Sequence, residues 1–243
     1  MRFMGTLFVV ATPIGNLNDI TLRAVEVLQS VDAIACEDTR RTGNLLRTLP
    51  TPIIIGVNTT NNTIRGPRLI SYYEQNEQRR IPEIINALKN GLNVALVSDA
   101  GTPTISDPGF KLVRECIAQG IKVESIPGPS SVISSLVSSG LPTDKFLFIG
   151  YLPKKPGNRA KVLQNIISII KIMKMTVILF EAPHRLVETL TELKEELGDI
   201  HTVIARELTK MHEEIRRENI SSLIAHFKEH TPKGEFAILF NPN

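Results

Sequence analysis

A short apolar segment that leads directly into a loop of small, turn-forming residues constrains the fold of this chain most. The segment is Val94–Val97, and the loop after it, Ser98–Gly109, is built mainly from Ser, Asp, Ala, Gly, Thr and Pro. Loops that follow strands in α/β proteins are common ligand sites, and glycine there lets the backbone approach a bound molecule. Asp99 and Asp107 supply hydrogen-bond acceptors. The same residue types also suit an ordinary strand-to-helix turn, so the loop alone leaves a binding role and a conformational role open.

Apolar runs typical of strands alternate with helical patterns along the chain, which predicts an α/β fold with parallel or mixed sheets. We expect strands over residues 7–11, 33–36, 94–97, 122–126, 176–180, 202–205 and 236–240. We expect helices over residues 21–28, 80–90, 110–119, 159–172, 186–197 and 220–228. A further helix that ends at Ser139 is expected after Ser130 and Ser131, whose hydroxyls suit helix capping as well as ligand binding.

The Pro-rich and basic stretch 151–157 has the composition of a hinge between two domains. We therefore expect an N-terminal α/β domain over residues 1–151 and a C-terminal α/β domain over residues 152–243. Residues 48–67 are rich in Thr, Asn and Pro and lack periodicity, so they are predicted to form a surface loop. Either a solvated helix face or a surface that steers RNA would explain the basic residues near the hinge, Lys154, Lys155, Arg159 and Lys161.

The balance of charge excludes a protein that wraps nucleic acid, because 28 basic residues face 25 acidic ones and the net charge is only +3. Any RNA contact is therefore expected to be local. Cys36 and Cys116 are far apart, and His226 and His230 have no third ligand nearby, so no metal site is expected. The apolar stretch 162–175 is interrupted by polar and charged residues, so no membrane span is expected. With no signal peptide recognised, the expected location is the cytoplasm.

Several common active-site motifs do not occur in this sequence. It contains no GxGxxG, no P-loop, no GxSxG and no HExxH motif, which argues against dinucleotide enzymes, nucleoside triphosphatases, serine hydrolases and zinc proteases of those types. Polar residues gather instead where predicted strands end, at residues 37–40, 99, 181–185 and 206–207. In α/β folds such strand ends border the ligand crevice.

Six ordered segments carry a resemblance to a known family, and they extend over nearly the whole chain. They are Leu7–Leu17, Cys36–Thr42, Ser98–Pro103, Pro127–Ser131, Phe180–Arg185 and Ala205–Lys210. Together they resemble the RsmI family, the small-subunit ribosomal RNA (cytidine-2′-O)-methyltransferases of the tetrapyrrole methylase superfamily. The resemblance implies two α/β domains of the tetrapyrrole methylase type with the cofactor cleft between them, and a homodimer. It also implies 2′-O-methylation of a cytidine in the decoding region of small-subunit ribosomal RNA, with S-adenosylmethionine as cofactor.

The resemblance assigns the cofactor site residue by residue. The positions that match cofactor-binding positions are Pro13, Asp99, Ala100, Gly101, Thr102, Ser130, Ser131, Glu181, Ala182, Glu207 and Leu208. S-adenosylmethionine carries a sulfonium cation, an amino-acid group and a flat adenine, so its site needs acceptors, backbone donors and close apolar walls. Loops of glycine and alanine between strands and helices offer these groups.

The polar clusters supply candidates for catalysis and for RNA binding. The catalytic candidates are Glu37, Asp38 and Arg40. The carboxylate of Glu37 or Asp38 would accept the proton of the ribose hydroxyl. The substrate-binding candidates are Arg41, Glu74, His184 and Arg185, with Glu74 a further proton acceptor. The arginines, Arg40 included, would hold flanking phosphates through forked hydrogen bonds. Two other interpretations stay open, namely a solvated ion-pair patch at residues 37–41 and a histidine at position 184 satisfied by the backbone.

One segment departs from the family pattern. Where the family commonly has Ser-Tyr-His-Glu-His-Asn-Glu, this chain has Tyr73 and Gln75 in place of both histidines, which removes any proton transfer assigned to them. Two other functions remain possible at this point. One is methylation of a tetrapyrrole, which the charged clusters suit less well than a phosphate-bearing substrate. The other is a ribosome-binding factor without catalysis that keeps a degenerate cofactor pocket.

Overall fold

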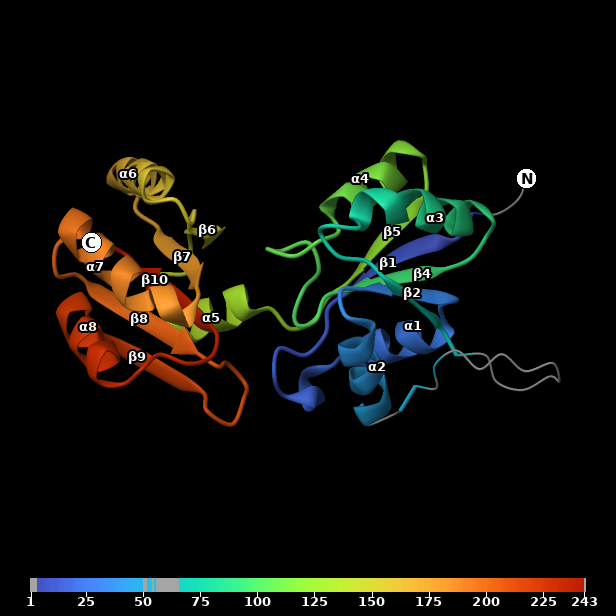
Figure 1. Ribbon diagram of the computed structural model, residues 1–243, viewed down its shortest axis with the longest axis horizontal. Helices are drawn as coiled ribbons and strands as arrows, with labels where there is room; N and C mark the ends of the chain where they lie inside the picture. The colour runs from blue at the N-terminus through green and yellow to red at the C-terminus, as the bar shows by residue number, and fades with distance from the viewer. Residues whose placement is uncertain (1–3, 50–51, 54, 56–65, 243) are drawn as a thin grey trace. The chain divides into compact units, whose positions relative to one another are not determined.

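The chain forms two compact α/β units, Met1–Ser130 and Ser131–Asn243 (Figure 1). The computed structural model describes residues 4–49, 52, 53, 55 and 66–242. Most of the loop expected over residues 48–67 therefore lies outside the described residues. Within its described part, Leu49 and Ile53 are buried in the core of the first unit, so these two positions are not surface loop.

A five-stranded parallel sheet forms the centre of the first unit. Its strands are β1 (Thr6–Val10), β2 (Ala33–Cys36), β3 (Arg68–Ser71), β4 (Val94–Val97) and β5 (Lys122–Ile126). They lie in the order β3-β2-β4-β1-β5, and every neighbouring pair is parallel. β2 and β4 are buried along their whole length, as expected for inner strands of a sheet that helices cover on both faces.

Helices cover both faces of this sheet. They are α1 (Leu22–Ser30), α2 (Thr39–Thr48), α3 (Glu77–Lys89) and α4 (Phe110–Ala118), with a short 3-10 helix η1 at Leu17–Asp19. The side chains of β4 alternate between the two faces, as the pleat of a strand requires. Leu96 belongs to the core under α3 and α4, whereas Ala95 and Val97 belong to the core under α1 and α2. Figure 1 shows the two helix pairs on opposite sides of the sheet.

The second unit is built on a mixed five-stranded sheet. Its strands are β6 (Phe146–Tyr151), β7 (Thr176–Glu181), β8 (His201–Arg206), β9 (Glu214–Asn219) and β10 (Phe236–Phe240). They lie in the order β6-β7-β10-β8-β9, with β6 parallel to β7 and the other neighbours antiparallel. The sheet is therefore mixed, which agrees with the predicted fold class.

Four helices cover the second sheet. α6 (Pro156–Ile172), α7 (Leu186–Leu197) and α8 (Ile220–Glu229) share a core with one face, and α5 (Ser131–Ser139) packs on the other. A 3-10 helix, η2, spans Pro183–Arg185 just before α7. None of the helices in the described ranges has the length and apolar composition needed to cross a bilayer.

The two units divide at Ser130 and Ser131, earlier than the boundary expected near Leu152. Side-chain packing and strand pairing, and not the Pro-rich composition after β6, decide where the units divide. Val132 and Leu136 of α5 belong to the core of the second sheet, and β6 pairs with β7. The Pro-rich stretch after β6 is thus a connection within the second unit, so a hinge-like composition does not mark the division here.

One of the basic residues after β6 is an interior residue. Arg159 of α6 is only 2% exposed, and its guanidinium bonds two carboxylates of α7. Its Nη2 lies 2.6 Å from Glu192 Oε1 and also bonds Glu188. Lys154, Lys155 and Lys161 are exposed, so the expectation of a continuous solvated or RNA-steering face fails at Arg159.

Replacing Arg159 should loosen the packing of α6 against α7. We expect Arg159→Ala to lower the free energy of unfolding of the second unit by about 1–3 kcal/mol, because a cavity forms and two carboxylates lose their partner. Hydrogen exchange of α6 and α7 amides measures this change. Lys161→Ala, on the same helix but exposed, is the control and should change little. Equal exchange in both variants would contradict a structural role for Arg159.

Candidate functional site

The candidate site lies at the edge of the first sheet where its parallel strands end. The segments that follow β1, β4 and β5 are joined there by short polar contacts. Thr12 and Gly101 exchange two backbone hydrogen bonds of 2.9 and 3.0 Å, and the Thr12 hydroxyl donates to the Ser98 carbonyl. Thr102 Oγ1 donates to the Pro129 carbonyl at 3.0 Å. These bonds hold three strand-end loops together, and Pro13, buried after Thr12, belongs to the same set.

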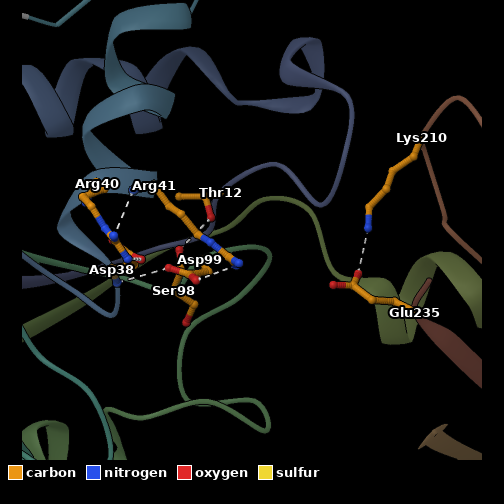
Figure 2. A network of polar contacts seen from close by, with 8 residues as sticks. All are labelled: Thr12, Asp38, Arg40, Arg41, Ser98, Asp99, Lys210 and Glu235. Carbon is orange, nitrogen blue, oxygen red and sulfur yellow. Dashed lines mark hydrogen bonds and ion pairs between the residues drawn. The ribbon is translucent and has the colours of Figure 1, made fainter. Parts of the chain in front are cut away.

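Asp99 connects the end of β4 to the end of β2. Its Oδ1 accepts a hydrogen bond from the Asp38 backbone N–H at 3.3 Å, and its Oδ2 lies 3.0 Å from Nη1 of Arg41 (Figure 2). A carboxylate has about four acceptor positions, so Asp99 keeps capacity for a further donor. The Arg41 side chain is 73% exposed, which leaves its other donors accessible. The structure thus brings the predicted cofactor residue Asp99 and the predicted substrate residue Arg41 into direct contact.

Asp38 is the N-terminal cap of α2, which begins directly after β2. Its Oδ1 accepts hydrogen bonds from the backbone N–H groups of Arg40 and Arg41, at 2.8 and 3.4 Å. The Arg40 side chain folds back onto Asp38, with Nη2 3.0 Å from Oδ2 (Figure 2). The hydrogen bond from the Arg40 side chain, with further help from its backbone N–H, lowers the pKa of Asp38 to about 2. Asp38 is therefore charged at neutral pH and a weak proton acceptor.

Glu37 has the opposite electrostatics although it is the neighbouring residue. Burial, together with the charges of Asp107 and Asp99, raises the pKa of its carboxyl to about 7, and hydrogen bonding from the Asp99 backbone and the Ser98 side chain offsets only part of this rise. Glu37 Oε1 and the Ser98 hydroxyl are buried, and neither makes a hydrogen bond of normal geometry with the described residues. A carboxyl with a pKa near 7 can both take and release a proton at neutral pH. Of the two catalytic carboxylates predicted from the sequence, Glu37 has the properties of a general base.

The loop between β4 and α4 has an unusual backbone. Thr104 and Ser106 have φ values of +73° and +62°, which side chains other than glycine adopt at a cost. Gly101 and Gly109 also have positive φ, and a Cβ at Gly109 would lie 2.6 Å from Leu96 Cδ2. Such conformations persist where the surrounding structure holds them, and they are frequent in ligand-binding loops. The shape of this loop therefore depends on glycine at both positions.

The cofactor and substrate residues expected in the second unit include two that are held in its interior. Glu181, at the end of β7, is 2% exposed, and both of its oxygens are engaged. Oε2 accepts from the Thr189 hydroxyl at 2.6 Å, and Oε1 accepts from the Ala182 N–H at 2.8 Å. Oε1 also pairs with Arg185 Nε at 3.4 Å, while Arg185 Nη2 donates to the Leu152 carbonyl at 3.0 Å.

This arrangement corrects the role expected for Arg185. A guanidinium that is buried and bonded to Glu181 and to the backbone does not offer its fork to an RNA phosphate. Its function here is to fix η2 against the chain after β6. His184, the neighbouring residue in η2, is exposed. Ser131 begins α5 in the same unit, directly after Ser130 at the end of the first unit.

Glu207 and Leu208 lie in the turn between β8 and β9. Glu207 has a φ of +48°, and its Oε1 accepts from the Glu235 N–H at 2.9 Å and from Lys210 Nζ at 3.0 Å. Lys210 also bonds Glu235 Oε2 at 3.0 Å, as Figure 2 shows. Leu208 packs on the core of the second sheet beside α5. These contacts give Glu207 a structural role in the turn.

The structure adds three residues that the sequence-based candidate set did not include. Thr12 and Ser98 occupy the loop ends that surround Asp99, and Asp107 acts on Glu37 through its charge. From the sequence, Asp107 is only an acceptor in a turn-rich loop. Ser98 and Thr12 each lie one or two residues beyond a strand, which is the one signal in the sequence that points to them.

The family model for tetrapyrrole (corrin/porphyrin) methylases matches residues 6–224 of the chain. This chain belongs to that family. Within it, the ribosomal RNA small subunit methyltransferase I of Synechocystis sp. is 48% identical over 237 residues, which are 97% of this chain and 78% of that protein. The protein of the same name from Thermotoga maritima is 44% identical over 238 residues, 98% of this chain and 99% of that protein. The resemblance predicted from the six motifs is confirmed.

Solved structures show the same family fold. A cobalt precorrin-4 methyltransferase, CbiF, matches with a TM-score of 0.65 at 15% identity and covers 96% of this chain and 94% of its own. A diphthine synthase matches with a TM-score of 0.64 at 16% identity, covering 97% and 89%. The predicted α/β fold of the tetrapyrrole methylase type is confirmed, and the chain is a methyltransferase.

The raised pKa of Glu37 predicts a pH-dependent effect of its replacement. Because the folded protein binds a proton that the unfolded chain releases above about pH 4.5, Glu37 lowers stability progressively as the pH rises toward 7. Glu37→Gln should therefore raise the melting temperature by about 2–4 °C at pH 8 and by much less at pH 5. Glu74→Gln, at an exposed position, is the control. An equal rise in melting temperature at pH 5 and at pH 8 would show that the pKa of Glu37 is not raised in the folded protein.

Proposed function

We propose that this protein transfers a methyl group from S-adenosylmethionine to the 2′-hydroxyl of a cytidine in the decoding region of small-subunit ribosomal RNA. The observation that carries the proposal is the 48% and 44% identity, over nearly the whole chain, to proteins named ribosomal RNA small subunit methyltransferase I. The ribose, the cytidine and the decoding region come from the motif resemblance. The geometry of the first unit supports the chemistry, because a carboxyl that titrates near neutral pH lies beside a strand-end loop.

The residues of the first unit fit S-adenosylmethionine. Asp99 has acceptor capacity left beyond its bonds to Asp38 and Arg41, which suits the ammonium and sulfonium charges of such a molecule. Ala100 is exposed and small, and Gly101 and Thr102 present backbone next to it. Pro13 and Ser130 belong to the adjoining loops. When bound, the cofactor supplies an electrophilic methyl group, while the chain binds and orients it.

Glu37 is the residue proposed to accept the proton of the ribose hydroxyl. Its pKa of about 7 lies near the working pH, whereas that of Asp38 is about 2, and a base works best when its pKa is close to the ambient pH. Its Oε1, which makes no hydrogen bond of normal geometry with the described residues, has acceptor capacity left for such a proton. Much of the rate would still come from positioning, up to roughly 7–11 kcal/mol in favourable cases.

Methylation of isolated small ribosomal subunits tests the function and the base together. We expect ribose methylation at one cytidine, mapped by mass spectrometry, and a loss of about 100-fold in kcat for Glu37→Gln with unchanged affinity for S-adenosylmethionine. Asp38→Asn is the matched control because Asn also caps helices, and it should lose less than about 10-fold.

Four other results would contradict parts of this proposal. A large loss for Asp38→Asn with none for Glu37→Gln would move the proton acceptor to Asp38. Activity unchanged in Asp38→Asn, Arg40→Ala and Glu37→Gln would remove residues 37–40 from the active site. Methylation of a tetrapyrrole precursor instead of RNA, or calorimetry that detects no binding of S-adenosylmethionine, would favour the two rival functions and overturn the proposal.

We further propose that the protein is a homodimer. We also propose that it acts in the cytoplasm, on ribosomal RNA. The support is an exposed apolar face on α5, where Ile133 and Val137 are 48% and 69% exposed. Sedimentation velocity should give twice the mass of one chain, and Val137→Asp should shift it toward one chain. Ile172→Asp, at an exposed residue of α6, is the control. A monomeric wild-type protein would overturn the proposal.

A further inference from the structure

A hollow in the first unit is lined mostly by residues that the candidate functional site does not use. It has a volume of about 290 Å³, and it is lined by the turn before α3 and by the loop that leads into α4. Its lining residues are Glu74, Glu77, Ser106, Asp107, Pro108, Gly109, Phe110 and Lys111. Asp107 belongs both to this lining and to the groups whose charge acts on Glu37. The hollow and the electrostatic surroundings of Glu37, the proposed proton acceptor, therefore have Asp107 in common.

The inner wall of the hollow is fixed and its outer wall is open. Glu77 is 4% exposed, and its carboxylate accepts from the Tyr72 hydroxyl at 3.2 Å and pairs with Lys111 Nζ at 2.5 Å. Phe110, in contrast, is 62% exposed although it is a large aromatic residue. Glu74 is also exposed. An accessible aromatic ring and an accessible carboxylate thus share one hollow of small volume.

A groove between α3 and α4 continues from this hollow through Lys111, which lines both. The α3–α4 groove has a volume of about 560 Å³. Its remaining lining residues are Gln78, Ile81, Pro82, Ile85, Asn86, Lys89, Arg114, Glu115 and Gln119. Three of its lining residues are cationic and one is acidic, and that acid, Glu115, already accepts a hydrogen bond from Gln119. Arg114 lies over the Phe110 ring, 5.6 Å from its centre.

This combination matches the chemistry of an unpaired nucleotide. Proteins that bind single-stranded RNA stack splayed bases on aromatic side chains and follow the backbone with cations. A carboxylate accepts hydrogen bonds from the exocyclic amine of cytosine, and it repels the carbonyl that uracil presents at the same position. The hollow is small enough to suit a single base, and the groove supplies cations for phosphates.

We propose that the hollow holds one unpaired, amine-bearing base of the RNA substrate, stacked on Phe110 with Glu74 as acceptor, and that the α3–α4 groove binds the adjoining phosphates. The proposal rests on the proposed function, since it takes RNA as the substrate. It adds a location on the first unit and names the group, Glu74, that would distinguish cytosine from uracil. Lys89 and Arg114 would contact phosphates, while Lys111 stays paired with Glu77.

Fluorescence anisotropy with a labelled single-stranded oligoribonucleotide that carries one cytidine among uridines tests the proposal. We expect Phe110→Leu and the double variant Lys89→Ala/Arg114→Ala each to weaken binding about tenfold. Phe110→Leu keeps an apolar side chain of similar bulk, and both sites are exposed, so folding should be retained. The matched control is Lys171→Ala/Lys174→Ala, which removes two exposed charges from the second unit and should leave binding nearly unchanged.

A second oligonucleotide, with uridine in place of the cytidine, tests the role of Glu74. The wild-type protein should bind the cytidine form several-fold more tightly, and Glu74→Gln should reduce this ratio to near one. Calorimetry with S-adenosylmethionine separates this inference from the proposed function, because these variants should bind the cofactor as the wild type does. Normal RNA binding by the Phe110 and Lys89/Arg114 variants, or an unchanged ratio in Glu74→Gln, overturns the inference while methylation stands. A wild-type protein that neither binds nor methylates RNA overturns the proposed function first.

Discussion

The parallel pairing of β1, β2 and β4 is the constraint on which the candidate site depends. The register places Val9 beside Leu96 and Cys36 beside Val97, so the three strands end at nearly the same level of the sheet. The residues directly after these strands therefore lie at the same edge of the sheet. The paired hydrogen bonds between Thr12 and Gly101 are possible because of this register. A shift of one residue in β4 would move its side chains to the opposite faces and displace Asp99 from Arg41.

Adjacent carboxyl groups acquire different chemistry from their surroundings. The Asp38 carboxylate accepts hydrogen bonds from backbone N–H groups at the start of α2 and from the Arg40 guanidinium. The Glu37 carboxyl is instead partly buried and is acted on by the charges of Asp107 and Asp99. A charged Glu37 lowers the free energy of unfolding of the protein. Active sites often lower stability in this way, because they hold reactive groups whose pKa is shifted. Helix α2 thus serves two purposes, since its N-terminus holds Asp38 and its second residue, Arg40, neutralises it.

The inner strands of both sheets were predictable from the sequence, whereas three of the four edge strands were not. β2, β5 and β10 match the expected residues because their apolar runs or turn boundaries are clear. The edge strands β3, β6 and β9 escaped prediction. β3 and β9 carry charged residues, β6 runs directly into the Pro-rich stretch interpreted as a hinge, and an edge strand needs only one partner. Helix α2 also escaped, because its polar start resembles a loop. Within the site, the loop residues were found from composition, but the burial of Arg185 depends on packing that composition does not report.

The division of the chain at Ser130 has a consequence for how the protein is made. All five strands of the first sheet come from the first 130 residues, and none of the described part of that sheet is supplied by later sequence. During synthesis, domains generally fold as units as they leave the ribosome, with the N-terminal one first. The first unit can therefore close its sheet, and assemble its strand-end loops, before the remaining polypeptide has been translated.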